Sequence, residues 1–198
     1  MNKILIATHN KGKLNEVTNA LKDLSFEVVS LNDLNINEDI EETGETYEEN
    51  AIIKAEFFGK LSGLPTIADD SGIVVEALKG ELGVKTRRWG AGEKANDQEW
   101  LDYFLKRMST EENKNTEFIS VIAFYKAGSP TKTFRGECKG VLLSKAPCKL
   151  EKGIPLSAIF LPNSKSKVFS MMSNDEKIAI SHRGMAIKKF KEYIKNNG

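Results

Sequence analysis

The stretch KILIATHNKGK, residues 3–13, joins a short apolar segment to a polar turn. Residues 3–8 are apolar and rich in β-branched side chains, which predicts a buried strand. Beyond the turn, apolar side chains recur at the spacing of one helix face, at Leu14, Val17, Leu21 and Leu24. A strand that turns directly into a helix is typical of α/β proteins, so this stretch predicts an α/β fold.

The middle of the chain continues the alternation of strands and helices. Strands are predicted at residues 26–31, 66–68 and 73–78, with a helix after the acidic stretch that separates the first two. A further helix is predicted to begin at Asn96, because Glu99 follows it at the spacing of a capping box.

The C-terminal third changes pattern. Two strands are predicted at about 117–127 and 131–143, separated by Gly128-Ser129-Pro130, which indicates a hairpin. Ser181 can cap a last helix. Because early strands alternate with helices and later strands form a hairpin, the sheet is expected to be mixed.

Composition excludes several classes of protein. The chain has 198 residues, of which 40% are hydrophobic and 29% charged, as in an ordinary globular protein. The net charge of +1 offers no basic field for long nucleic acid, and no apolar run could span a membrane. Two cysteines without metal-site spacing favour a cytoplasmic protein, and two histidines are too few for a multi-histidine zinc site.

The turn at residues 8–13 is a candidate anion site. A turn between a strand and a helix exposes backbone N–H groups at the helix N-terminus. Thr8 and Asn10 can hydrogen-bond phosphate oxygens, and Lys13 adds a positive charge. The glycine spacing is not that of a Walker loop, and an ordinary polar turn is the alternative.

Asp69-Asp70-Ser71-Gly72 is expected to end the strand at 66–68. Ligands of α/β sheets bind beyond the carboxyl ends of strands, where a carboxylate can hold Mg²⁺ or accept a proton from water. Adjacent carboxylates repel, so the pair needs counter-charges or water. A solvated turn is the alternative, since Asp-Ser-Gly is common in turns.

Two further clusters carry charge. Residues 38–49 are rich in Asp and Glu and contain no Lys or Arg, and Glu41 or Glu42 could complement Asp70 at a magnesium site. Most acids of this stretch are expected on a solvated face. Near the C-terminus, Lys177 and the sequence Ser181-His182-Arg183 could recognise the edge of a base, or simply begin an exposed helix.

In this order and spacing, the four motifs resemble the inosine triphosphate pyrophosphatase family, which clears non-canonical purine triphosphates such as ITP and XTP. The family pattern T-x-N-x-x-K-x-x-E falls on residues 8–16, and E-T-G-x-T-[FY]-x-E-N-A-x-x-K-A falls on residues 42–55. A-D-D-S-G covers residues 68–72, and S-H-R-x-x-A covers residues 181–186. The resemblance extends over nearly the whole chain.

The resemblance implies an elongated mixed sheet flanked by helices, in one pyrophosphatase domain over residues 1–198 with two lobes and an active-site cleft between them. It also implies a homodimer and hydrolysis of a nucleoside triphosphate to a monophosphate and pyrophosphate with Mg²⁺. Asp70 would be the general base and Lys13 a second catalytic residue. The metal would be held by Asp69, Asp70 and either Glu41 or Glu42.

Residues that bind substrate are carried over by position from the same motifs. They are Thr8, His9, Asn10, Lys11, Gly12, Lys13, Lys54, Ser71, Lys177, His182 and Arg183, to which Ile154 and Ser157 are added from the segment where the base is expected.

The chain departs from the family pattern where the base is expected. The family has G-F-G-[YW]-D-P, whereas this chain has Ile154, Leu156 and Ser157 in place of the two aromatic residues and the Asp. Smaller departures are Thr86-Arg87-Arg88 in place of S-A-R, and Met171 in place of an acid. The motifs for the triphosphate are intact, while those for the base are altered.

We therefore expect cleavage between the α- and β-phosphates of a non-canonical nucleotide such as ITP, dITP or XTP, with Asp70 activating water. One alternative is the same chemistry on a different or modified nucleotide. Another is that Trp89 or Phe160 restores the lost aromatic contact. A nucleotide-binding protein without turnover is the alternative from another class.

Overall fold

A computed structural model describes residues 2–78, 80–92 and 94–197. Its centre is a six-stranded sheet in the order β2-β1-β3-β4-β5-β6. The strands are β1 (Asn2–Ile6), β2 (Phe26–Ser30), β3 (Thr66–Val75), β4 (Asn115–Tyr125), β5 (Lys132–Leu142) and β6 (Phe160–Pro162). β1 pairs in parallel with β2 and β3, and the remaining pairs are antiparallel. The mixed sheet and the hairpin are therefore confirmed.

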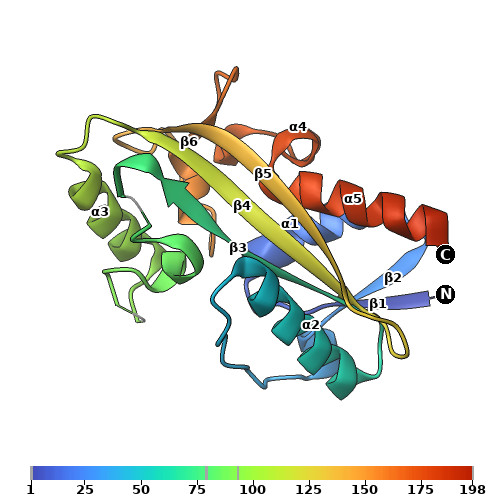
Figure 1. The fold of residues 1–198 in the computed structure, drawn as a ribbon. Helices are drawn as coiled ribbons and strands as arrows, with labels where there is room; N and C mark the ends of the chain where they lie inside the picture. The colour runs from blue at the N-terminus through green and yellow to red at the C-terminus, as the bar shows by residue number, and fades with distance from the viewer. Residues whose placement is uncertain (1, 79, 93, 198) are drawn as a thin grey trace.

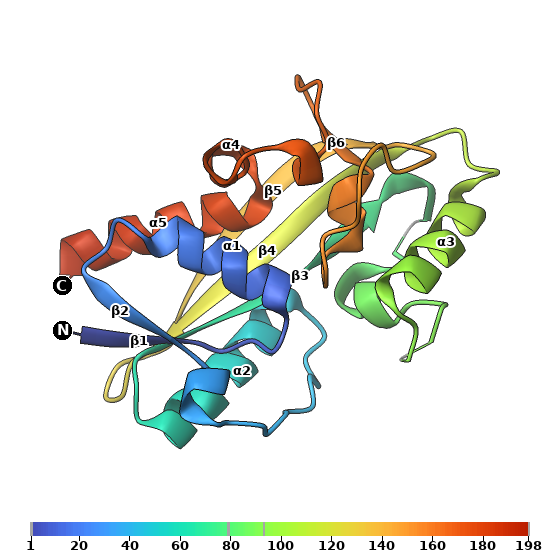
Figure 2. The same ribbon diagram turned by 180° about the vertical axis from the view of Figure 1, so that it is seen from behind.

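Helices cover both faces of the sheet (Figures 1 and 2). They are α1 (Lys11–Leu21), α2 (Tyr47–Ser62), α3 (Asp97–Met108), α4 (Asn174–Ile180) and α5 (His182–Asn197). Side chains of β1 alternate between the faces. Ile4 and Ile6 pack with α1 and α5, whereas Leu5 packs with α2. Each face of the sheet therefore has its own cluster of apolar side chains, buried between β1 and the helices that cover that face.

The long hairpin of β4 and β5 extends beyond β1 and β2 toward α3 (Figure 1). There a separate apolar cluster joins β3 and β4 to α3 and to the segment after β5. Its largest members include Trp100, Phe104, Phe118, Phe160 and Phe169. The elongated, helix-flanked mixed α/β fold expected from the sequence is confirmed.

Two local predictions have different outcomes. The capping box at Asn96 is present, because its side chain accepts from the Glu99 N–H while the Glu99 carboxylate accepts from the Asn96 N–H. The expected break at residues 69–72 is wrong, since β3 runs unbroken from Thr66 to Val75. Its backbone pairs with β4 throughout, and counter-charges from other elements make the polar side chains tolerable within the strand.

None of the helices in the described ranges is long and apolar enough to cross a membrane.

Candidate active site

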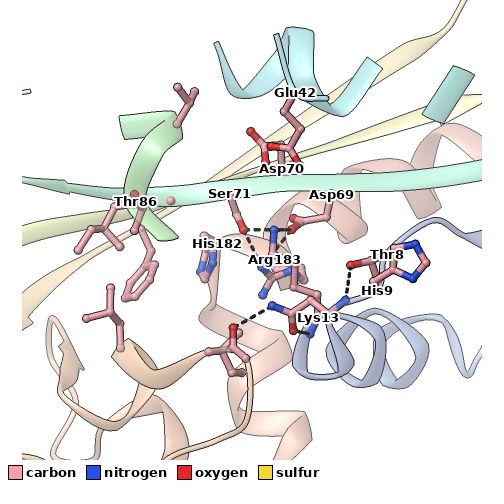
Figure 3. A pocket seen from close by; sticks show the side chains of 18 of the residues that line it. Thr8, His9, Lys13, Glu42, Asp69, Asp70, Ser71, Thr86, His182 and Arg183 are labelled. Atoms are coloured by element: carbon pink, nitrogen blue, oxygen red, sulfur yellow. Dashed lines mark hydrogen bonds and ion pairs between the residues drawn. The ribbon is translucent and has the colours of Figure 1, made fainter. Parts of the chain in front are cut away.

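A cavity of about 310 Å³ lies beyond the end of β1 and along the middle of β3. It is bordered by the β1–α1 turn, α2, β3, α3, the segment 153–157 and the start of α5. Its charged lining residues include Lys13, Lys54 and Asp70, and its apolar lining residues include Phe118 and Leu156 of the cluster around α3. We call these two parts the polar end and the apolar end of the cavity; Figure 3 labels Lys13 and Asp70 of the polar end. The cavity therefore offers different chemistry to the two ends of an elongated ligand.

The β1–α1 turn contributes Thr8, His9, Asn10 and Lys13 to the lining. Asn10 is the N-cap of α1, and its Oδ1 accepts from the Lys13 N–H at 3.1 Å. Its Nδ2 donates to the carbonyl of Gly153 at 2.8 Å, which ties the turn to the opposite wall. Asn10 thus holds the turn in shape as well as bordering the cavity.

Lys11 and Gly12 do not line the cavity. Lys11 is exposed, and Gly12 lies against the segment before Gly153. A Cβ at Gly12 would come within 2.7 Å of the Lys152 carbonyl oxygen. The glycine is needed there because two backbone segments approach closely.

Asp69 points toward the face of β3 that packs with α1 and α5, which we call the α1/α5 face. Its Oδ2 is 2.8 Å from Lys13 Nζ and 3.2 Å from Arg183, and the hydroxyls of Ser71 and Ser120 donate to the carboxylate. Burial would raise the pKa of Asp69, but the charges of Arg183 and Lys13 outweigh it and hold the pKa well below its usual value. Asp69 is therefore an ionised, fully partnered anchor.

Asp70 points to the opposite face of β3, toward α2, because adjacent residues of a strand alternate. We call this the α2 face. Asp70 Oδ1 and Glu42 Oε1 each lie 3.0 Å from Lys54 Nζ. Asp70 Oδ2 is buried and has no hydrogen-bond partner among the described residues. Burial raises the pKa of Asp70, although Lys54 and Lys13 offset part of the effect.

The carboxylates of the α2 face fit a magnesium ion shared with phosphate. Mg²⁺ in such sites is usually held by one or two carboxylates together with substrate phosphates. Glu42 and Asp70 both border the cavity, and Asp70 keeps an unpartnered oxygen. Glu41 is exposed and outside the lining, and Asp69 is occupied by cations. Among the described residues, no group of three or more His, Cys, Asp or Glu side chains is arranged to hold a metal ion.

His182 contributes a neutral ring to the apolar end. Its imidazole stacks on Phe118 with ring centroids 4.8 Å apart. Burial, reinforced by the charge of Arg183, lowers the pKa of His182 well below its usual value, so the ring is uncharged at neutral pH. Its buried Nδ1 has no partner in the described part of the chain. Ile154 and Ser157 line the cavity from the segment 153–157.

The Ham1 family model matches residues 4–193 of this chain. The chain belongs to the Ham1 family. A dITP/XTP pyrophosphatase of Christiangramia forsetii is 38% identical over 97% of this chain and 98% of its own length. A dITP/XTP pyrophosphatase of Bacillus subtilis is 36% identical over 98% of each chain.

Solved Ham1 structures share the fold. The Staphylococcus aureus Ham1 protein superposes with a TM-score of 0.82 at 32% identity, covering 100% of both chains. A Ham1 protein from Coxiella burnetii gives 0.83 at 32% identity, covering 99% of this chain and 100% of its own. The resemblance inferred from the four motifs is confirmed.

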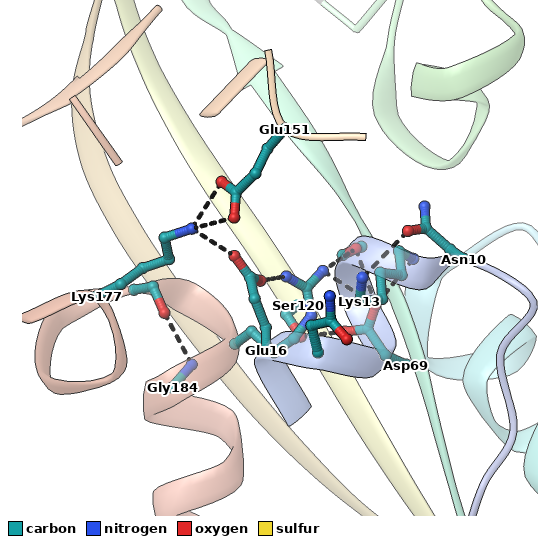
Figure 4. A network of polar contacts seen from close by, with 12 residues as sticks. Asn10, Lys13, Glu16, Asp69, Ser120, Glu151, Lys177 and Gly184 are labelled. Atoms are coloured by element: carbon teal, nitrogen blue, oxygen red, sulfur yellow. Dashed lines mark hydrogen bonds and ion pairs between the residues drawn. The ribbon is translucent and has the colours of Figure 1, made fainter. Parts of the chain in front are cut away.

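Lys177 is held away from the cavity lining in this Ham1 family member. Its Nζ lies 3.1 Å from Glu16 and 2.8 Å from Glu151, and its side chain is buried (Figure 4). Glu16 also pairs with Arg183, which does line the cavity and donates to Ser71 at 2.9 Å. Lys177 therefore supports the site through an ion network, and direct contact with a base stays a prediction.

Several cavity residues were not singled out from the sequence. Asp39, Phe58, Trp100 and Phe118 border the cavity, whereas Trp89 and Phe160 are not among its lining residues. In the sequence, Phe118 and Trp100 have the spacing of ordinary core residues of a strand and a helix, so nothing nearby indicated that they would line a cavity. The departure at residues 86–88 adds Thr86 to the lining, and the side chains of Arg87 and Arg88 lie outside the description.

Proposed function

We propose that this Ham1 family member hydrolyses non-canonical purine nucleoside triphosphates, such as dITP and XTP, to a monophosphate and pyrophosphate. The observation that carries this proposal is Asp70, which lines the cavity and has one carboxylate oxygen without a hydrogen-bond partner among the described residues. Both relatives compared at sequence level are named dITP/XTP pyrophosphatases, and each matches nearly the full chain.

Asp70 acts as the general base. Its carboxylate accepts the proton of a water that attacks the α-phosphorus, and the raised pKa makes it a better base than an exposed carboxylate. Lys54, 3.0 Å from Oδ1, keeps the carboxylate oriented. The P–O bond to the β-phosphate breaks, and pyrophosphate leaves with the electron pair.

The cations of the site offset the phosphate charge. Lys13 is oriented by Asp69 and borders the cavity, so its ammonium can meet phosphate oxygens without losing its position. Glu42 and Asp70 are the residues that would hold Mg²⁺. When bound, the ion would neutralise phosphate charge and polarise the reacting phosphorus.

The apolar end would hold the base. Ile154 and Leu156 bury ring surface without aromatic stacking, and the neutral His182 and Ser157 supply hydrogen bonds. This altered wall favours the alternative that the same chemistry acts on a differently modified nucleotide, and the substrate range decides between the two.

The test is pyrophosphate release from dITP, XTP, ITP, GTP, ATP and dUTP on one preparation, with Mg²⁺ and with EDTA. Metal-dependent release that is fastest for the first three supports the proposal. Release only from another nucleotide supports the altered-substrate alternative, and tight binding without release supports a binding protein.

The remaining expectations are separate proposals. We propose a single domain over residues 1–198, because one sheet runs through both ends of the molecule. A homodimer, a cytoplasmic location and Mg²⁺ as the metal stay predictions. Light scattering, cell fractionation and metal substitution test them in turn.

A further inference from the structure

Gly153, at the start of the cavity wall 153–157, is held from two sides by different elements. Its N–H donates to Asp97 Oδ2 at 2.7 Å, and its carbonyl accepts from Asn10 Nδ2 at 2.8 Å. Asp97 is the first residue of α3, and Asn10 is the N-cap of α1. One residue of the wall therefore joins α3 to the β1–α1 turn.

The backbone of Gly153 depends on such restraints. Its φ is +83°, in the left-handed region, and a Cβ there would come within 2.5 Å of Asn10 Oδ1. Glycine populates positive and negative φ about equally, so its own preference does not hold this conformation. The hydrogen bonds to Asp97 and Asn10 contribute the restraint that the residue lacks.

The side chain of Asn10 passes the restraint on to Lys13. Asn10 Nδ2 is bound to the Gly153 carbonyl, while Asn10 Oδ1 accepts from the Lys13 N–H at 3.1 Å. Both groups belong to one planar amide, so the orientation that serves one partner also serves the other. Three hydrogen bonds thus connect Asp97, which lies outside the cavity lining, to Lys13, which borders the cavity.

We propose that Asp97 is a positioning residue: by holding Gly153, it sets the place of the wall 153–157 and, through Asn10, that of the β1–α1 turn. Its effect on substrate rests on the proposed function, which places the base at the wall and the phosphates at the turn. Asp97 thereby makes α3 responsible for the spacing between the two parts of the site.

Two variants of Asp97 separate its hydrogen bond from its charge. Asp97→Ala removes the acceptor, whereas Asp97→Asn loses the charge and keeps a carbonyl oxygen that can accept from Gly153. The distinction is needed because an acidic residue in the first turn stabilises a helix by itself. Asp102→Ala is the matched control, since Asp102 is an exposed acid of α3 whose carboxylate accepts from the Gln98 side chain.

Amide hydrogen exchange in the ligand-free protein tests the connection. In Asp97→Ala, we expect the Gly153 amide to exchange about 3- to 10-fold faster, as loss of one hydrogen bond predicts. The Lys13 amide should accelerate more than the amides of α2, which report any general loss of stability. Both effects should be largely reversed in Asp97→Asn and absent in Asp102→Ala. An unchanged Lys13 amide, or equal acceleration in both Asp97 variants, overturns the proposal.

Steady-state kinetics with dITP extends the test to substrate. Asp97→Ala should raise KM about 3- to 10-fold with kcat nearly unchanged, because the bridge serves binding while Asp70 and Lys54 lie outside it. Asp97→Asn should recover most of the difference. An unchanged KM, or a loss confined to kcat, overturns the role in binding. If the unmodified protein releases no pyrophosphate from dITP, ITP or XTP, the proposed function fails, and the exchange measurement still decides whether Asp97 positions the turn.

Discussion

The two faces of β3 place adjacent aspartates in opposite circumstances. On the α1/α5 face, Asp69 is surrounded by Lys13, Arg183 and two hydroxyls, which use its hydrogen-bonding capacity. On the α2 face, Asp70 has one cation on one oxygen, and its other oxygen has no hydrogen-bond partner in the described part of the chain. Identical side chains one residue apart are thus divided between holding the site together and reacting, and only the surrounding elements distinguish them.

Removing the charge of Asp70 should produce the largest effect on turnover. Asp70→Asn is nearly isosteric and should lower kcat by on the order of 10²–10⁴, the usual contribution of a positioned base. Steady-state pyrophosphate release measures the loss, with circular dichroism to show that the fold persists. Turnover within a few-fold of the unmodified enzyme would assign the base elsewhere.

The same change at Asp69 should act on stability first. Asp69→Asn leaves the buried Arg183 and the half-buried Lys13 without their shared counter-charge, and breaking a buried pair costs about 3–5 kcal/mol. Urea unfolding at neutral pH measures the free energy of unfolding. A stability equal to that of Asp70→Asn would mean that the two faces do not differ as described.

Lys13 combines the two roles, because it pairs with the anchor Asp69 and also borders the cavity where the phosphates are proposed to bind. Lys13→Ala should lower kcat/KM by roughly 10- to 100-fold, the range of a charged hydrogen bond. The factor should be similar for every nucleoside triphosphate, because the phosphates are common to all. A loss that varied strongly with the base would contradict a phosphate role.

His182 should give the α1/α5 side a pH dependence. Its folded pKa lies well below the usual value of 6.5, so the unfolded chain binds a proton that the folded protein does not. Stability is therefore present above pH 6.5 and is lost as pH falls below it. Between pH 7.5 and 5.5, His182→Phe should lose about 1.4 kcal/mol less stability than the unmodified protein. Parallel urea titrations at both pH values check this, and equal losses in the two proteins would contradict a neutral buried His182.

Restoring an aromatic ring at the apolar end should have the smallest effect. Ile154→Phe adds a stacking surface where the family pattern has one, and aromatic pairs contribute about 0.5–1.5 kcal/mol beyond burial. We expect the ratio of kcat/KM for ITP to that for ATP to rise a few-fold, while Leu156→Ile serves as a control for repacking. An unchanged ratio would show that aliphatic burial already serves the base fully.

The features that depend on neighbouring residues could be predicted from the sequence. The Asn96 capping box, the hairpin and the buried strand at the N-terminus follow from side chains close in sequence, and each is present. The continuity of β3 through Asp69 and Asp70 was missed, because Lys13, Lys54 and Arg183 come from distant elements. Trp100 was missed for the same reason, since only the tertiary fold brings α3 to the cavity.

The pH at which each aspartate takes up its proton tests the division between the faces most directly. Carbon-13 NMR of labelled Asp carboxyl groups, assigned with Asp69→Asn and Asp70→Asn, follows both residues in one protein. We predict that Asp70 titrates above the ordinary value of 3.8 and that Asp69 stays ionised well below it. The reverse order would contradict the assignment of Asp70 as the base and Asp69 as the anchor.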